Sequence, residues 1–105
     1  MKEFLLDTPV TATFFAYLGN FGQVEALPHV GEGFYKCEKP DWFSIKGFSG
    51  DTTVEVRFKK EVMDLTMDFL YALFSSYREE ETDLTLLKQR EHAIGERVSR
   101  RLHGV

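Results

Sequence analysis

The sequence predicts an α+β fold, an antiparallel sheet of four to five short strands within residues 2 to 60 packed against two C-terminal helices. Glycine and proline are concentrated between residues 9 and 50 and are nearly absent afterwards, as expected for a strand-and-turn half followed by a helical half. Strands followed by helices favour this class over a βαβ arrangement. Without repeats or a linker, residues 1–105 read as a single domain.

The first candidate element lies within residues 10–26 and has two interpretations. As a hairpin with a Gly19 to Phe21 loop, it would place alternate small and apolar residues on one face. As a helix, it would begin at Asp7-Thr8-Pro9 and carry apolar residues at helical spacing. The density of Thr, Val, Phe and Tyr favours the hairpin, and residues 9–21 stay open between the two structures.

The second candidate hairpin is formed by residues 42–48 and 53–59, with Ser49 to Thr52 as its loop. A shift of one residue would set Ile45 against Glu55, so the hydrophobic pattern selects the register. In that register the core-facing pairs are Gly47 with Val54, Ile45 with Val56 and Phe43 with Phe58, and Lys46 faces Glu55 on the other side. Another strand is expected at Phe34 to Glu38, followed by a turn at residues 39–41.

The next element is a helix over residues 61–78 that is apolar over more than half of its circumference. One stripe contains Val62, Leu65, Phe69 and Leu73, and the second contains Met63, Met67, Leu70, Phe74 and Tyr77. Burial of a large apolar side chain contributes about 1.5 to 3 kcal/mol. Exposure of the second stripe would therefore forfeit an energy comparable to the stability of a small domain, so we expect it to be covered.

The last element is a charged amphipathic helix over residues 83–103 with one narrow apolar stripe. The stripe can cover only part of the preceding helix and is also suitable for a partner chain. We therefore predict a non-enzymatic interaction or assembly domain that forms a homodimer or binds another protein. The predicted interface residues are Met63, Met67, Leu70, Phe74, Tyr77, Leu87, Ile94 and Val98.

The alternative function is the binding of a small hydrophobic or aromatic molecule in a cavity between sheet and helices. Aromatic residues make up 14% of the chain, and such residues with a few polar groups are usual in ligand pockets. The candidate pocket residues are Trp42, Phe48, Asp68, Tyr71 and His29. Stripes of Met and Phe at helical spacing are more often part of a core.

No stretch of the sequence carries a catalytic or metal-binding pattern, and no cofactor is expected. Cys37 and His29 are the nearest candidates for a nucleophile or ligand, but a tetrahedral zinc site needs about four ligands. A lone cysteine in a strand is usually a small buried hydrophobe. The protein is therefore expected to be a binding protein rather than an enzyme.

Charge and cysteine content limit the partners and the compartment. A net charge of -4 and a pI near 5.3 disfavour nucleic acid, because phosphate contacts require clustered Lys and Arg. The basic residues near the C-terminus complement the dipole of the last helix. A single cysteine and no signal peptide favour the cytoplasm, and no apolar stretch is suited to span a bilayer.

Overall fold

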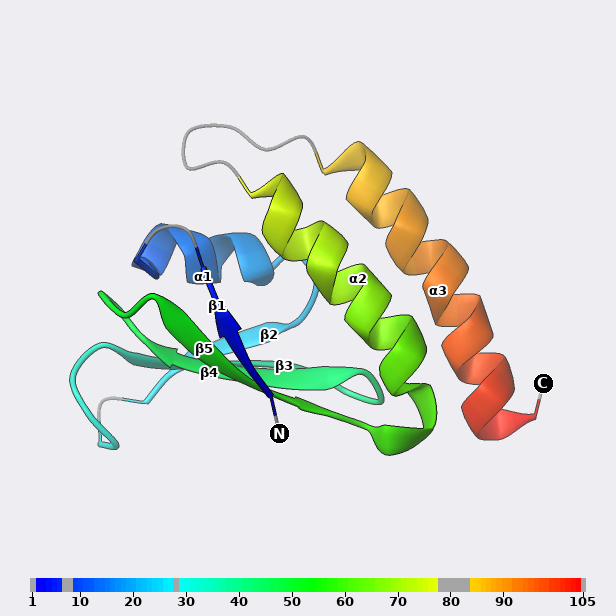
Figure 1. The fold of residues 1–105 in the computed structure, drawn as a ribbon, viewed down its shortest axis with the longest axis horizontal. Helices are drawn as coiled ribbons and strands as arrows, with labels where there is room; N and C mark the ends of the chain where they lie inside the picture. The colour runs from blue at the N-terminus through cyan, green and yellow to red at the C-terminus, as the bar shows by residue number, and fades with distance from the viewer. Residues whose placement is uncertain (1, 7–8, 28, 78–83, 105) are drawn as a thin grey trace. The chain divides into compact units, whose positions relative to one another are not determined.

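The computed structural model describes residues 2–6, 9–27, 29–77 and 84–104, and the chain divides into two compact units, residues 1–57 and 58–105 (Figure 1). The elements of the first unit are β1 (Lys2–Leu5), α1 (Ala12–Leu18), β2 (Gln23–Ala26), β3 (Phe34–Lys39), β4 (Phe43–Phe48) and β5 (Thr53–Phe58), whose last residue crosses the boundary. The elements of the second are the 3-10 helix η1 (Lys60–Val62), α2 (Met63–Ser76) and α3 (Thr85–His103).

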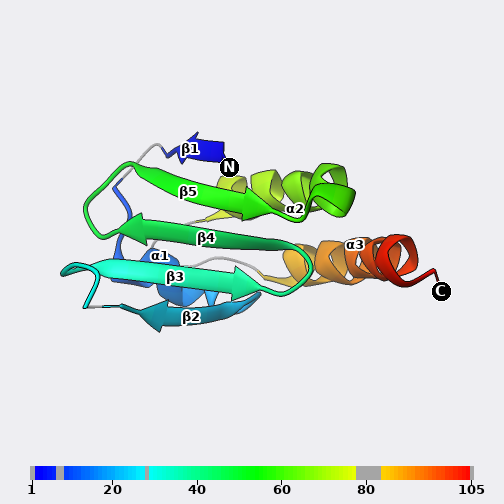
Figure 2. The same ribbon diagram turned by 90° about the horizontal axis from the view of Figure 1, so that it is seen from below.

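The five strands form one antiparallel sheet in the order β1-β5-β4-β3-β2, which Figure 2 shows face on. This sheet in the N-terminal half, followed by helices at the C-terminus, confirms the predicted α+β class. The predicted strand at Phe34 to Glu38 is confirmed as β3. It ends in a tight turn in which the Trp42 amide donates to the Lys39 carbonyl at 3.0 Å.

The predicted core face of the second hairpin is confirmed by alternating burial along β4 and β5. Phe43, Ile45 and Gly47 are buried on β4, and Val54 and Val56 are buried on β5. A Cβ atom on Gly47 would lie 3.0 Å from a methyl carbon of Val54, so these two residues lie against each other as the predicted register requires.

Of the two alternatives within residues 10–26, the favoured hairpin is wrong and the helix is confirmed, because Ala12–Leu18 form the helix α1. Thr11 caps α1, and its hydroxyl accepts a hydrogen bond from the Phe14 amide at 3.1 Å. Phe14 and Phe15 are both buried, whereas consecutive residues of a strand point to opposite faces. The alternative helix start at Asp7-Thr8-Pro9 lies partly outside the described residues. The observed helix begins at Ala12.

The core of the first unit lies between α1 and the sheet face it covers. The Phe15 ring stacks on Tyr35 of β3 at 4.8 Å between centroids, and the Cys37 thiol donates to the Leu18 carbonyl at 3.9 Å. The buried apolar side chains of this unit are Val10, Phe14, Phe15, Tyr17, Leu18, Phe21, Cys37, Trp42, Phe43, Ile45, Val54 and Val56.

The second unit is a pair of helices, α2 and α3, preceded by η1. Asp68 of α2 lies 3.5 Å from Arg90 of α3, and Arg101 of α3 pairs with Asp64 and donates to the Glu61 carbonyl at 3.3 Å. The Arg101 hydrogen bond lowers the pKa of the Asp64 carboxyl. These contacts join both ends of α3 to α2.

The two helices agree closely with the predicted ranges. The predicted helix at 61–78 is observed as η1 and α2, and the helix at 83–103 is observed as α3 from Thr85, while residues 78–83 lie outside the described part of the chain. Gly104 ends α3 in the left-handed conformation, with φ 69°. Among the helices described, none has the length and apolar character needed to cross a bilayer.

Candidate interaction surfaces

The eight residues predicted as an interface divide into a buried and an accessible group. Leu70, Leu87, Ile94 and Val98 are buried, with Leu70 at 0% exposure. Met63 is 38% exposed, whereas Met67, Phe74 and Tyr77 are half-buried. A partner can therefore reach Met63, Met67 and Phe74 of α2 more readily than Leu70 or the predicted interface residues of α3.

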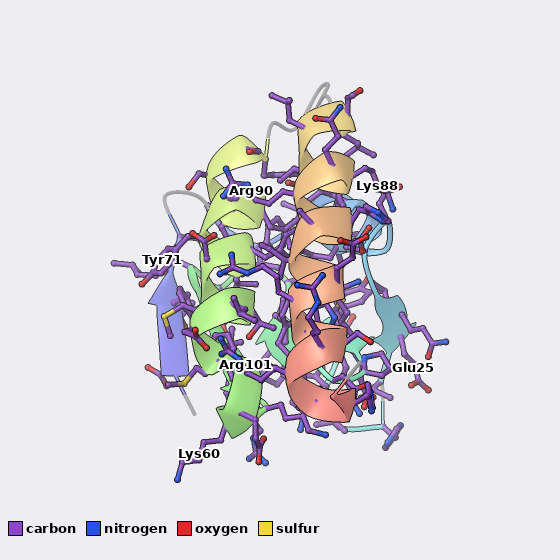
Figure 3. The ribbon with its side chains drawn as sticks, turned by 90° about the vertical axis from the view of Figure 1, so that its right-hand side faces the viewer. Glu25, Lys60, Tyr71, Lys88, Arg90 and Arg101 are labelled. Atoms are coloured by element: carbon purple, nitrogen blue, oxygen red, sulfur yellow. The ribbon has the colours of Figure 1, made fainter. Side chains whose placement is uncertain are left out.

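Four α2 side chains form what we call the α2 ridge: Met63, Met67, Tyr71 and Phe74. Residues three or four positions apart lie on one side of a helix, so the ridge extends along about 16 Å of α2. Tyr71 is 56% exposed. Figure 3 shows it projecting from α2 away from α3. The accessible apolar and aromatic groups of α2 are thus continuous.

The residues predicted to line a ligand pocket are dispersed. Trp42 immediately precedes β4 and Phe48 is its last residue, so they lie about 20 Å apart along the strand. Trp42 is buried, with the Lys39 ammonium 4.4 Å from its ring centroid, and His29 is exposed in the loop before β3. The structure does not bring Trp42 and Phe48 together.

The other two predicted pocket residues lie on α2. Asp68 is exposed and pairs with Arg90 of α3, which gives its carboxylate a structural partner within the second unit. Tyr71 belongs to the α2 ridge. Neither position provides an enclosed site within the second unit, because both side chains lie at its surface.

A second surface, which sequence reasoning did not identify, is the sheet face opposite α1, here called the open face. It is uncovered by the described residues of the first unit (Figure 2). One row across it is largely apolar and consists of Leu5, Thr53, Phe48 and Phe34. The Phe34 and Phe48 rings lie 4.7 Å apart, and Leu5 is 79% exposed.

The next row of the open face contains two like-charge pairs. Glu3 lies directly opposite Glu55 on β1 and β5, and Lys36 lies directly opposite Lys46 on β3 and β4. Like charges directly opposite each other destabilise a sheet. Each pair has one ion-paired member, because Arg57 lies 3.3 Å from Glu55 and Glu38 lies 3.1 Å from Lys36.

The described strands of this sheet line hollows on the surface. One, of about 190 Å³, lies between the acidic and basic pairs; its lining includes Glu3, Phe34, Lys46, Phe48, Asp51, Thr53 and Glu55. Another, of about 440 Å³, follows the β2 edge, where it is lined by Gln23, Val24, Glu25, Lys36 and Glu38. Both are open, and the first joins the apolar row to the charged row.

The signal for the open face was partly visible in the sequence. Lys46 opposite Glu55 follows from the second hairpin alone, and it suggests an ordinary solvated face. The two like-charge pairs arise from β1 beside β5 and β3 beside β4. The register of those neighbours could not be derived from the local pattern.

Cys37 is a core residue of β3. Its side chain is 1% exposed, and burial raises the pKa of the thiol to about 11, with Lys39 opposing this increase. A thiol with such a pKa is protonated at neutral pH and is a poor nucleophile. Its chemistry is that of a small buried hydrophobe.

Over residues 2–6, 9–27, 29–77 and 84–104, no three His, Cys, Asp or Glu side chains are grouped so that they could hold one metal ion. His92, on α3, is 81% exposed and lies 3.3 Å from Glu96.

Compared with known proteins, the chain matches no family model, no curated protein and no solved structure.

Proposed function

We propose that this protein is a non-enzymatic interaction domain that self-associates through the α2 ridge. The observation that supports this proposal is the run of Met63, Met67, Tyr71 and Phe74 along one accessible side of α2. Methionine and aromatic residues are enriched at the centres of protein interfaces. A second copy of the ridge is the proposed partner, because two-fold homodimers are the commonest oligomers.

The position of the ridge is consistent with such a contact. The polar side of α2 is engaged within its own unit, because Asp64 and Asp68 pair with Arg101 and Arg90. Tyr71 and Met63 are the most exposed members of the ridge. Packing Tyr71 against a partner would bury a large side chain with few rotatable bonds, a frequent choice at binding hot spots.

The proposed compartment is the cytoplasm. Cys37 is the only cysteine of the chain and its thiol is free and buried, a pattern that suits a compartment where thiols remain reduced. A reporter fusion or fractionation of the native protein tests this assignment, and recovery from an oxidising compartment would refute it.

The test of the self-association is the molar mass in solution across a range of protein concentrations. We expect the unaltered chain to dimerise with rising concentration and Met63→Glu/Tyr71→Glu to remain a folded monomer. Both positions are exposed, so the substitutions are compatible with the fold. Light scattering after size exclusion gives the mass, and circular dichroism verifies the fold.

The matched control is Leu86→Glu/Gln89→Glu on α3. It introduces the same charge at two exposed positions, one of them an apolar residue at 73% exposure. We expect the control to dimerise like the unaltered chain. If the unaltered chain remains monomeric at all concentrations, or if the control dissociates as much as the ridge variant, the α2 ridge is not the interface.

A further inference from the structure

We infer that the open face of the sheet binds the same face of a second copy of this chain, about a two-fold axis that runs parallel to the strands between β4 and β5. This contact is separate from the α2 ridge and requires neither its residues nor its association. The charges of one row and the apolar groups of the adjacent row both become complementary about this axis.

The charged row is self-complementary when it is reversed. Along the strand order β1, β5, β4 and β3 it reads Glu3, Glu55, Lys46 and Lys36. The place of Glu55 beside Lys46 follows from Gly47, which lies against Val54 one residue along each strand. Two acidic residues are thus followed by two basic ones, and Glu25 of β2, directly opposite Lys36, continues the row.

A half-turn about the proposed axis reverses the strand order and keeps each row above itself. The partner's basic pair then lies over the acidic pair, with the partner's Lys36 above Glu3 and the partner's Lys46 above Glu55. The same two contacts recur on the other side of the axis, as an isologous interface requires. The repulsion within each pair is therefore offset by attraction across the interface.

The apolar row is also complementary under the same half-turn. Leu5 of one copy lies over Phe34 of the other, and Thr53 lies over Phe48. Leu5 is 79% and Phe48 is 39% exposed, so this contact removes apolar surface from water. A stacked sheet at about 10 Å is within reach of these side chains.

Two features define the limits of the contact. Glu25, on β2, lies beyond the overlap of the two copies, because β2 has no opposite strand in this arrangement. Asp51, which lies in the β4–β5 loop and lines the smaller hollow, lies close to the axis and meets its own copy. That like-charge contact opposes association and lowers the affinity.

The overlap covers four strands, or about 19 Å across the sheet. Such a surface is at the low end of specific interfaces, so the dimer forms at high protein concentration. Screening also affects it strongly, because the Debye length falls from about 10 Å at 0.1 M salt to about 3 Å at 1 M. Association is therefore expected to weaken with salt.

The test is a charge swap carried out in the full chain with Met63→Glu/Tyr71→Glu also present, so that the α2 ridge is disabled. One variant carries Glu3→Lys/Glu55→Lys and has an all-basic row; the other carries Lys36→Glu/Lys46→Glu and has an all-acidic row. We expect neither to self-associate. Mixed together they should form a heterodimer at least about tenfold tighter than either homodimer, as measured by sedimentation velocity.

Two single variants complete the experiment. Glu25→Lys is the control on the same face; because Glu25 lies beyond the overlap but directly opposite Lys36, it should alter self-association less than Glu3→Lys, whereas Asp51→Asn should tighten it. Absence of a heterodimer from two folded variants, or an equal effect of Glu25→Lys and Glu3→Lys, would overturn the inference. Because the α2 ridge is disabled throughout, failure of the ridge proposal would leave these results unaffected.

Discussion

On the sheet face covered by α1, opposing residues are apolar or small, whereas on the open face two pairs of directly opposite residues carry like charges. Gly47 leaves room for Val54 and Phe15 on the covered face, while Glu3 opposes Glu55 on the open face. The covered face therefore contributes to stability, whereas the open face mixes attractive pairs such as Glu25–Lys36 with repulsive pairs whose cost a complementary surface offsets. The two faces can be separated experimentally, because stability and association respond to different substitutions.

The largest difference is expected between Phe15→Ala and Phe48→Ala. Phe15 is 1% exposed and stacks on Tyr35, so its truncation should lower the free energy of unfolding by about 3 to 5 kcal/mol. Phe48 is 39% exposed, and its truncation should cost less than about 1.5 kcal/mol in the monomer. Urea denaturation at low protein concentration measures both, and equal costs would mean that the open face is covered within the chain.

Gly47→Ala should give the next largest effect. The added Cβ would lie 3.0 Å from Val54 and 3.5 Å from the Phe15 ring, and overpacking of a core costs about 1 to 3 kcal/mol. The double variant Gly47→Ala/Val54→Ala removes the nearer contact and should cost less than the sum of its two single variants. Additive costs would contradict this account of the Gly47 contact.

Thiol chemistry offers a third comparison of the faces. Because burial raises the pKa of Cys37 to about 11, its thiolate fraction near pH 8 is about a hundredfold below that of an ordinary thiol. We expect Ser44→Cys, on the open face, to react rapidly with Ellman's reagent while Cys37 reacts only upon unfolding. Rapid labelling of the folded, unaltered chain would show that the covered face opens.

The same thiol implies a dependence of stability on pH. Its pKa is raised from 9.0 to about 11 by folding, so only the unfolded state releases the proton between these values. Stability from this group is complete below pH 9 and falls as the pH rises toward 11. Cys37→Ala should remove this part of the alkaline loss, detected by urea denaturation as a function of pH.

The smallest effect on stability is expected for Glu3→Lys. It converts the Glu3–Glu55 repulsion into attraction and should stabilise the monomer by about 0.2 to 1 kcal/mol, while it weakens association through the open face. Thermal unfolding and sedimentation velocity on the same variant record the two opposite changes. A loss of monomer stability would show that the pair is not repulsive.

The sequence predicts the secondary structure correctly where the hydrophobic pattern is local. The β4–β5 hairpin follows from alternation of Ile45, Val54 and Val56 with charged residues, and α2 and α3 follow from helical spacing. The failure at residues 12–18 has a local cause: Thr and Phe favour a strand, but Thr11 supplies a helix cap. Phe14 and Phe15 are adjacent and both buried, which a helix allows and a strand with one covered face does not.

The candidate surfaces were less accessible to sequence reasoning because they depend on neighbours that are distant in the chain. Leu70 has the same helical spacing as Met63 and Met67, yet it is fully buried while Met63 is exposed. Trp42 and Phe48 point to the same side in a strand pattern, but they lie a strand length apart. The Glu3–Glu55 pair forms only when β1, the first strand in the sequence, pairs with β5, the last strand in the sequence.

That last pairing also determines when the sheet can be completed. β2, β3 and β4 are joined in sequence by short connections and can pair as they emerge from the ribosome, whereas β1 is made first and must wait for β5. Pairings between distant segments form slowly because loop-closure entropy precedes the gain in contacts. The N-terminal strand is thus the first to be translated and the last to be incorporated, so the nascent chain carries an unpaired β1 through most of the synthesis of its own sheet.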